Sequence, residues 1–395
     1  MQPHEAKVFT LDRAPNQKAT ACLQPGKRTM RDRPGMNRMS ILLVLSLAQI
    51  LVSSLLLTYL SMENWSAVFA EDSEGYILVA RFFSGDDTPA PLLPLLKYRL
   101  FSPLVPFLAA LLGRIIPLEY AFLVLNFFFW LSSVYLVYRF SLVLINQPLA
   151  YYCALLFTTS LPLIVWGLPI MVDMGAFFMA VLNCLLIIHP SQKKPVRLLV
   201  ALTLPLAMLT KPNLIALVIF FVLNTGLRKE YGRIVVVVAV TVMLVGGVYF
   251  SLGLTLHDFR ALGYLRHRGF VYVINALIFC FHWGIPLGIW GFAEEKHHRT
   301  FYLTYLVSTF GCYLTFVHNP RLLFITFPAV LPLVVQGMES CAQGAAERWR
   351  AQPRRFFTSL VVCYMLTSNV LAAIYLYITR VLQYRSIETL GNLLK

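Results

Sequence analysis

Apolar runs recur along most of this chain and are separated by short polar or proline-containing connections. The first run covers residues 41–60, and others follow almost without a break to Arg380. A helix needs roughly 20 apolar residues to cross a bilayer. The pattern therefore predicts an all-α, polytopic membrane protein with about 11 transmembrane helices. The expected spans are 41–60, 119–138, 149–167, 171–188, 197–210, 213–227, 233–252, 270–291, 300–317, 322–338 and 356–379.

The composition agrees with this pattern. Hydrophobic residues make up 58% of the chain and charged residues 13%, and the mean hydropathy is +0.70, which exceeds the range of soluble domains. We expect a basic, disordered cytoplasmic tail at 1–38, a membrane domain at 39–380 and a short outer tail at 381–395. The net charge of +15 then reflects topology and anionic lipid headgroups, with no nucleic-acid partner.

Basic residues indicate the orientation of the spans. They gather in the first 38 residues and in several short connections between expected spans. Because positive loops stay in the cytoplasm, we place the N-terminus inside and the C-terminus outside. Short loops and compact size favour an integral, multi-pass protein of a bacterial inner membrane. The basic connections hold Lys193, Lys194, Arg197, Arg228, Lys229, Arg233, Lys296, Arg299, Arg348, Arg350, Arg354 and Arg355.

This topology requires a long first outer loop, at 61–118. Counting residues 101–116 as a further span would turn the later basic connections outward, so we expect 74–84 and 92–116 to be juxtamembrane helices at the outer interface. Long structured loops usually carry function. A series of prolines suits such a segment: Pro89, Pro91, Pro94, Pro103 and Pro106.

Charges at the outer ends of the expected helices are the candidates for chemistry. Asp72 and Glu74 follow the first span, where carboxylates are costly unless they have a role. Lys211 interrupts an apolar run and precedes Pro212, which breaks the helix and indicates an anion site. Asp173 lies at the outer start of another expected span. Each candidate has a structural alternative: the two acids can be solvated at a helix N-terminus, Lys211 can snorkel, and Asp173 can cap its helix.

Short motifs between residues 40 and 340 extend these candidates. They are Asp72-Ser73-Glu74-Gly75-Tyr76, Ala80-Arg81, Ser84-Gly85-Asp86, Tyr98-Arg99, Pro103, Asp173, Met208-Leu209-Thr210-Lys211, Arg321 and Phe327-Pro328. Together they resemble the GT-C glycosyltransferases, which include protein O-mannosyltransferases and the aminoarabinose transferases that modify lipid A.

The resemblance implies a GT-C-like enzyme that transfers a hexosyl or pentosyl group from a polyprenyl-phosphate carrier on the non-cytoplasmic face. Only a short tail follows the last expected span, so a lipid-linked or small glycan acceptor fits better than a protein. The sugar and the stereochemistry stay open. The implied roles are catalysis for Asp72 and Glu74, phosphate binding for Lys211, Arg99, Lys97 and Arg321, and a further site contribution from Asp173 and Tyr76.

Other signals are weaker. No glycine-rich phosphate loop occurs, so we expect no nucleotide cofactor, while a divalent metal is not excluded. The cysteines are scattered and show no zinc spacing. The main alternative is a lipid or solute transporter in which Asp173 and Lys211 form a relay, although the chain shows no internal repeat. A scaffold without catalysis would not need the clustered outer charges.

Overall fold

The computed structural model describes residues 36–60, 72–87, 90–189, 193–255, 258, 270–316, 325–349 and 352–378. Every regular element in these ranges is a helix, which confirms the predicted all-α class. The chain divides into two units, Met1–Ile41 and Leu42–Lys395. In the first unit only the beginning of helix α2 is described, and the candidate site lies in the second.

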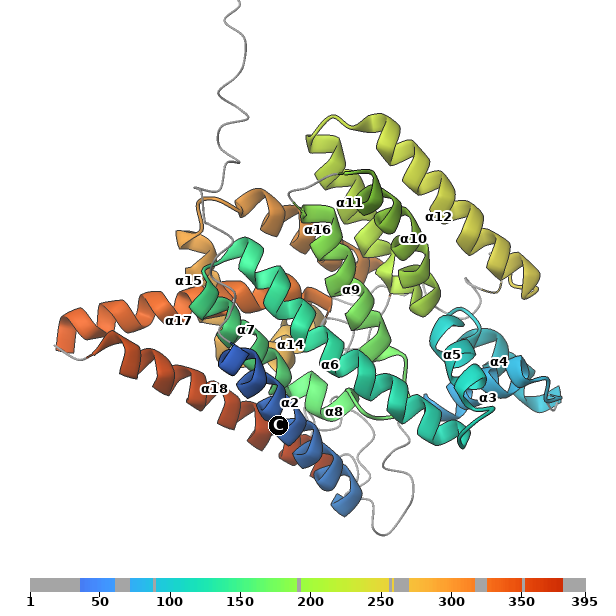
Figure 1. Cartoon of the computed structure of the whole chain (residues 1–395), viewed down its shortest axis with the longest axis horizontal. Coiled ribbons are helices and arrows are strands. Elements are labelled where there is room, and N and C mark those ends of the chain that lie inside the picture. Colours follow the sequence, from blue (N-terminus) through green and yellow to red (C-terminus); the bar gives the residue numbers. More distant parts are fainter. Residues whose placement is uncertain are drawn as a thin grey trace, which may run out of the picture. The chain divides into compact units, whose positions relative to one another are not determined.

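The helices follow one another through mostly short connections (Figure 1). They are α2 (Met36–Leu60), α3 (Ser73–Ser84), η2 (Ala90–Leu92), α4 (Leu93–Arg99), α5 (Leu104–Leu112), α6 (Leu118–Leu144), α7 (Gln147–Thr158), α8 (Leu161–Trp166), α9 (Asp173–Ile188), α10 (Lys194–Thr210), η3 (Pro212–Leu214), α11 (Ile215–Leu227), α12 (Tyr231–Ser251), α14 (Phe270–Phe281), α15 (Gly284–Glu294), α16 (Arg299–Phe316), α17 (Phe327–Trp349) and α18 (Pro353–Leu376).

Three helices of the described chain, α6, α12 and α18, are long and apolar enough to cross a bilayer, and the bent pair α4 and α5 would make a fourth. Shorter apolar helices cover Ser40–Leu56, Asp173–Ile188 and Pro212–Leu227. Helix α12 also exposes large apolar side chains, such as Val235 and Phe250, as lipid-facing helices do. These features support a membrane protein, while the number of about 11 spans stays a prediction.

Three expected helices are interrupted. The segment 92–116 consists of α4 and α5, which meet at 106° at a break before Pro103 at the N-cap of α5. The segment 149–167 breaks into α7 and α8 ahead of Pro162, whose ring lacks the N–H that a continuous helix needs. The segment 270–291 breaks at His282, whose φ of 37° lies in the left-handed region. The expectation of single helices was wrong at these three places.

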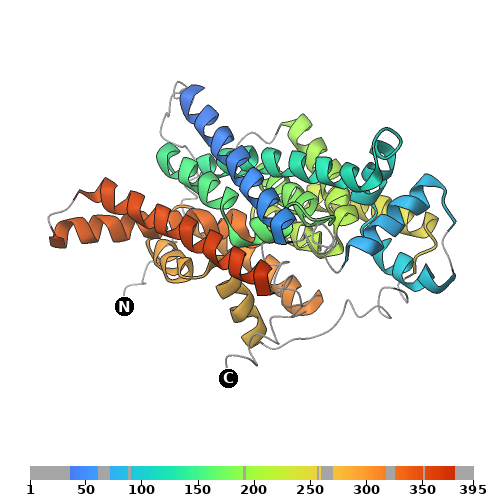
Figure 2. The ribbon, with the colours of Figure 1, turned by 90° about the horizontal axis from the view of Figure 1, so that it is seen from below.

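The outer-loop helices α3, α4 and α5 form a group beside α6, as Figure 1 and Figure 2 show. Apolar residues of α3, of α4 and of the turn after α4 meet in a cluster of Val79, Leu96, Leu100, Phe101 and Leu254, the last of which follows α12. The Tyr249 hydroxyl of α12 donates a hydrogen bond to the Phe101 carbonyl at 2.9 Å. Because full burial of an aliphatic or aromatic side chain from water contributes about 1.5–3 kcal/mol, this cluster fixes the outer-loop helices against the end of α12.

The connection from α8 to α9 is buried throughout residues 167–172. Gly167 is needed here, because a Cβ at this position would lie 2.7 Å from the ring of Trp130. From α6, the Asn126 side-chain amide donates a hydrogen bond to the Pro169 carbonyl at 2.7 Å. A buried connection requires such partners for its backbone groups. These contacts fix the point at which α9 begins.

Candidate active site

Asp72 stands at the N-cap of α3, yet its side chain makes no capping hydrogen bond. Instead, Asp72 Oδ1 forms an ion pair with Nη2 of Arg99, the last residue of α4. Both side chains are 13% exposed. A solvated acid at a helix end would be more exposed and would bind the helix amides, so this geometry argues against the capping alternative.

Arg99 is held by more than its ion pair. Its guanidinium carbon lies 4.4 Å from the ring centre of Tyr98 and 5.1 Å from that of Tyr76, within cation–π range. Gly75 leaves space for the arginine stem, because a Cβ there would lie only 2.7 Å from Arg99 Cγ. Tyr76, an expected site residue, is thus buried beside the guanidinium. Position 75 requires a residue without a side chain, because the arginine stem occupies that space.

Asp173 is the first residue of α9, and its Oδ1 forms an ion pair with Lys211 Nζ. The Asp173 side chain is 1% exposed and that of Lys211 is 11% exposed. Lys211 has an extended backbone between α10 and η3, directly before Pro212, as the broken-helix interpretation predicted. A lysine that snorkels from a helix end would place its ammonium in water, so its burial against a carboxylate disfavours that alternative.

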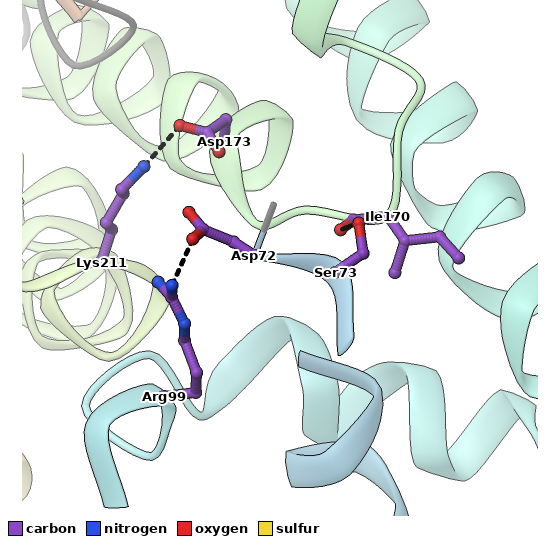
Figure 3. Close-up of polar contacts among 6 residues, drawn as sticks. All are labelled: Asp72, Ser73, Arg99, Ile170, Asp173 and Lys211. Atoms are coloured by element: carbon purple, nitrogen blue, oxygen red, sulfur yellow. Dashed lines mark hydrogen bonds and ion pairs between the residues drawn. The ribbon is translucent and has the colours of Figure 1, made fainter. Parts of the chain in front are cut away.

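The two ion pairs belong to one cluster. The Ser73 hydroxyl donates a hydrogen bond to the Ile170 carbonyl at 2.8 Å, which joins the start of α3 to the connection before α9. Figure 3 shows the Asp72 side chain pointing between Arg99 and the Asp173–Lys211 pair. Two carboxylates and two cations therefore balance in charge, and their low exposure strengthens the electrostatic interactions among them.

The other expected site residues take different positions. Glu74 is exposed on the first turn of α3. The Lys97 side chain is 54% exposed, and its Nζ lies 3.8 Å from Asp258 Oδ1. Arg321 lies outside the described residues, as do the start of the outer loop at 61–71 and the basic stretch around Arg266.

Several residues that shape the site had no role in the sequence interpretation. Ser73, Gly75 and Tyr98 stood in the quoted motifs without a role, and Asn126 was not singled out. All four support the charged residues or the connection before α9 through the contacts given above. Asn213 follows the break at Lys211; it is buried, and no group among the described residues forms a hydrogen bond with its Oδ1. A polar residue next to a helix break was a signal for Asn213, whereas the others depend on tertiary contacts.

The chemistry of the cluster suits an anionic ligand. Arginine binds phosphate oxygens bidentately, and a buried lysine provides a compact charge. Within the described part of the chain, no group of three or more His, Cys, Asp and Glu side chains is arranged to hold a metal ion. In this structure the carboxylates of Asp72 and Asp173 are paired with basic side chains.

Comparison with known proteins shows which solved structures share the fold of this chain. No sequence-family model and no curated protein sequence matches the chain. Its structure is similar to that of the Archaeoglobus fulgidus oligosaccharyltransferase in the apo form, with a TM-score of 0.55, 11% identity, and coverage of 84% of this chain and 56% of that one. The helices of this chain are therefore arranged as in the matched part of that oligosaccharyltransferase.

A second structure, of the oligosaccharyltransferase AglB from Archaeoglobus fulgidus, is equally similar. It contains an inhibitory peptide and a dolichol-phosphate, and it aligns with a TM-score of 0.54, 12% identity, and coverage of 84% of this chain and 56% of that one. The chain thus spans little more than half of the oligosaccharyltransferase. At this identity the similarity concerns the fold, and it confirms the GT-C resemblance at that level.

Proposed function

We propose that this chain is a membrane glycosyltransferase that moves a sugar from a polyprenyl-phosphate carrier to a lipid-linked or small glycan acceptor on the non-cytoplasmic face. The observation that carries the proposal is the meeting of the Asp72–Arg99 and Asp173–Lys211 ion pairs where the outer-loop helices contact the membrane helices. A base and two cations are what this transfer needs. The GT-C fold and the dolichol-phosphate bound to AglB support the proposal.

In the reaction, the Asp72 carboxylate accepts the proton of an acceptor hydroxyl while that oxygen forms a bond with the anomeric carbon. The bond from this carbon to the phosphate oxygen breaks, and the polyprenyl phosphate leaves with one more negative charge. Arg99 and Lys211 stabilise that charge. A positioned general base contributes about 10²–10⁴-fold to a rate, and fixed cations stabilise charge that develops in the transition state.

The geometry favours Asp72 over Glu74 as the base. Asp72 points into the cluster, whereas Glu74 is exposed. By the same reasoning, Arg99 and Lys211 are the phosphate-binding cations, because their side chains lie in the cluster. Lys97 has a secondary role, since its side chain is 54% exposed and its ammonium lies 3.8 Å from Asp258 Oδ1.

The site must face outward for this function. In the topology expected from the basic connections, α3, α4, α5 and the beginning of α9 lie on the non-cytoplasmic side. A bacterial inner membrane, with the N-terminus in the cytoplasm, meets this condition. Apolar surfaces between helices would accommodate the polyprenyl tail, and the Asn213 Oδ1 would accept a hydrogen bond from a hydroxyl of the sugar.

The proposal is tested by transfer of radiolabelled sugar in proteoliposomes that contain the full chain. A panel of polyprenyl-phosphate sugars is offered with membrane lipids and short glycans as acceptors, and the wild type is compared with Asp72→Asn. We expect labelled product from at least one donor with the wild type, and transfer slower by about 10²-fold or more with the variant. Equal labelling by both proteins would reject Asp72 as the base.

The same vesicles test the alternative function. A transporter that uses Asp173 and Lys211 as a relay would move the labelled compound across the membrane without changing its chemistry. Translocation of unaltered donor, with no labelled product from any donor in the panel, would replace the glycosyltransferase proposal by the transporter.

A further inference from the structure

The two ion pairs of the site differ in how easily they can open. Asp173 is 1% exposed, so removing Lys211 from it would leave a buried charge without this partner, which is strongly unfavourable. Asp72 is 13% exposed, so water can hydrate its carboxylate when the arginine leaves. Asp72 can therefore lose its arginine at lower cost than Asp173 can lose its lysine.

Arg99 is also built to keep its place when it exchanges partners. The rings of Tyr76 and Tyr98 lie against its guanidinium, and its stem lies against Gly75. These cation–π contacts are attractive and do not depend on the carboxylate. The arginine thus remains at the end of α4 as a positioned cation that an incoming anion can approach.

The Asp72–Arg99 pair opposes the chemistry that the site is proposed to perform. A carboxylate oxygen that accepts a hydrogen bond from a guanidinium is a weaker proton acceptor, because the positive charge stabilises the ionised form. A phosphate offers the guanidinium two parallel hydrogen bonds and a full negative charge. The donor's phosphate therefore competes directly with Asp72 for Arg99.

We propose that Arg99 is an ion-pair switch: it holds Asp72 until the phosphate of the donor takes over its guanidinium, and this exchange releases the carboxylate to accept the acceptor's proton. The inference rests on the proposed function and extends it. The base becomes competent only when a donor is bound. A lipid-linked sugar without a phosphate would leave Asp72 paired and would not react.

The exchange is tested by carboxyl labelling, independently of sugar transfer. The purified full chain is treated with a water-soluble carbodiimide and a small amine, with or without polyprenyl phosphate, and the labelling of Asp72 is quantified by peptide mass spectrometry. Exposed Asp86, on the same outer segment, reports the reagent's general reactivity. We compare the wild type with Arg99→Gln, and use Arg81→Gln as a matched control because Arg81 is exposed on α3.

We expect polyprenyl phosphate to increase Asp72 labelling several-fold in the wild type and in Arg81→Gln. Arg99→Gln should show the higher labelling without phosphate and no further increase with it. Binding of radiolabelled polyprenyl phosphate is measured on the same samples. Binding without an increase in Asp72 labelling would overturn the switch and leave the proposed function intact, whereas absence of binding would contradict both.

Discussion

Replacing Lys211 by methionine tests how strongly the buried ion pair determines the structure of the site. The substitution keeps most of the side-chain volume and removes the positive charge. Asp173, 1% exposed, would then carry a buried charge without its lysine. Removal of one partner from such a pair costs about 3–5 kcal/mol, because the remaining charge cannot be hydrated. We therefore expect Lys211→Met to lower the melting temperature clearly.

The pair also predicts the result of a second substitution. Combining Lys211→Met with Asp173→Asn removes both charges, and replacement of a whole buried pair is often neutral. The double variant should recover most of the lost melting temperature, although it lacks a phosphate-binding cation and should remain inactive. Arg99→Met should be milder than Lys211→Met, because Asp72 has more access to water.

Melting is followed by tryptophan fluorescence of the purified protein in one detergent. Lys194→Met is the matched control, since Lys194 is exposed at the start of α10, the helix that ends directly before Lys211. An unchanged melting temperature for Lys211→Met would refute the reasoning that Asp173 remains charged and depends on this lysine. A double variant no more stable than the single one would refute the coupling between the two residues.

Three further predictions concern other contacts. Gly75→Ala should displace the Arg99 stem, which lies 2.7 Å from the new Cβ, and reduce sugar transfer; Gly246→Ala, with open space in α12, should keep full activity. Burial raises the pKa of Glu295, but hydrogen bonds from Gln336 and two turn amides lower it more, to below the usual value. The ionised Glu295 therefore stabilises the folded protein fully at pH values above the usual carboxyl pKa, and this contribution is lost as the pH falls through the lowered pKa of the folded state. Glu295→Gln should thus flatten the acid side of a plot of melting temperature against pH. Ser368→Ala removes the hydrogen bond between the Ser368 hydroxyl and His282, the histidine at the α14–α15 break. It should lower the free energy of unfolding by about 1–3 kcal/mol, which is measured by melting.

Much of the architecture could be predicted because bilayer-spanning helices leave a strong sequence signal. A long apolar run has few alternatives, and a charge within it is costly. This cost is why Asp72 and Lys211 were identifiable as candidates before any contact was known. The break at Lys211 was also predictable, because Pro212 cannot continue the helix hydrogen bonds.

The pairings could not be predicted, because they join residues distant in the chain. Nothing local distinguishes Arg99 from Lys97, which is two positions earlier on the same short helix; the packing of α3 on α4 turns one toward Asp72 and the other toward Asp258. Glu74 is likewise only two positions from Asp72, yet helix periodicity places it on the exposed face of α3. The break at His282 had a local signal that the sequence interpretation did not use, because Gly284 and Pro286 follow it directly.

The central claim is that Asp72 is the base of a sugar transfer from polyprenyl phosphate. Its most direct test compares initial transfer rates of Asp72→Asn and Asp86→Asn at equal protein amounts, with polyprenyl-phosphate binding measured on the same vesicles. Asp86 is an exposed carboxylate of the same outer segment. We expect Asp72→Asn to bind the carrier and to lose about 10²-fold or more in rate, while Asp86→Asn keeps the wild-type rate. A wild-type rate for Asp72→Asn would contradict the account.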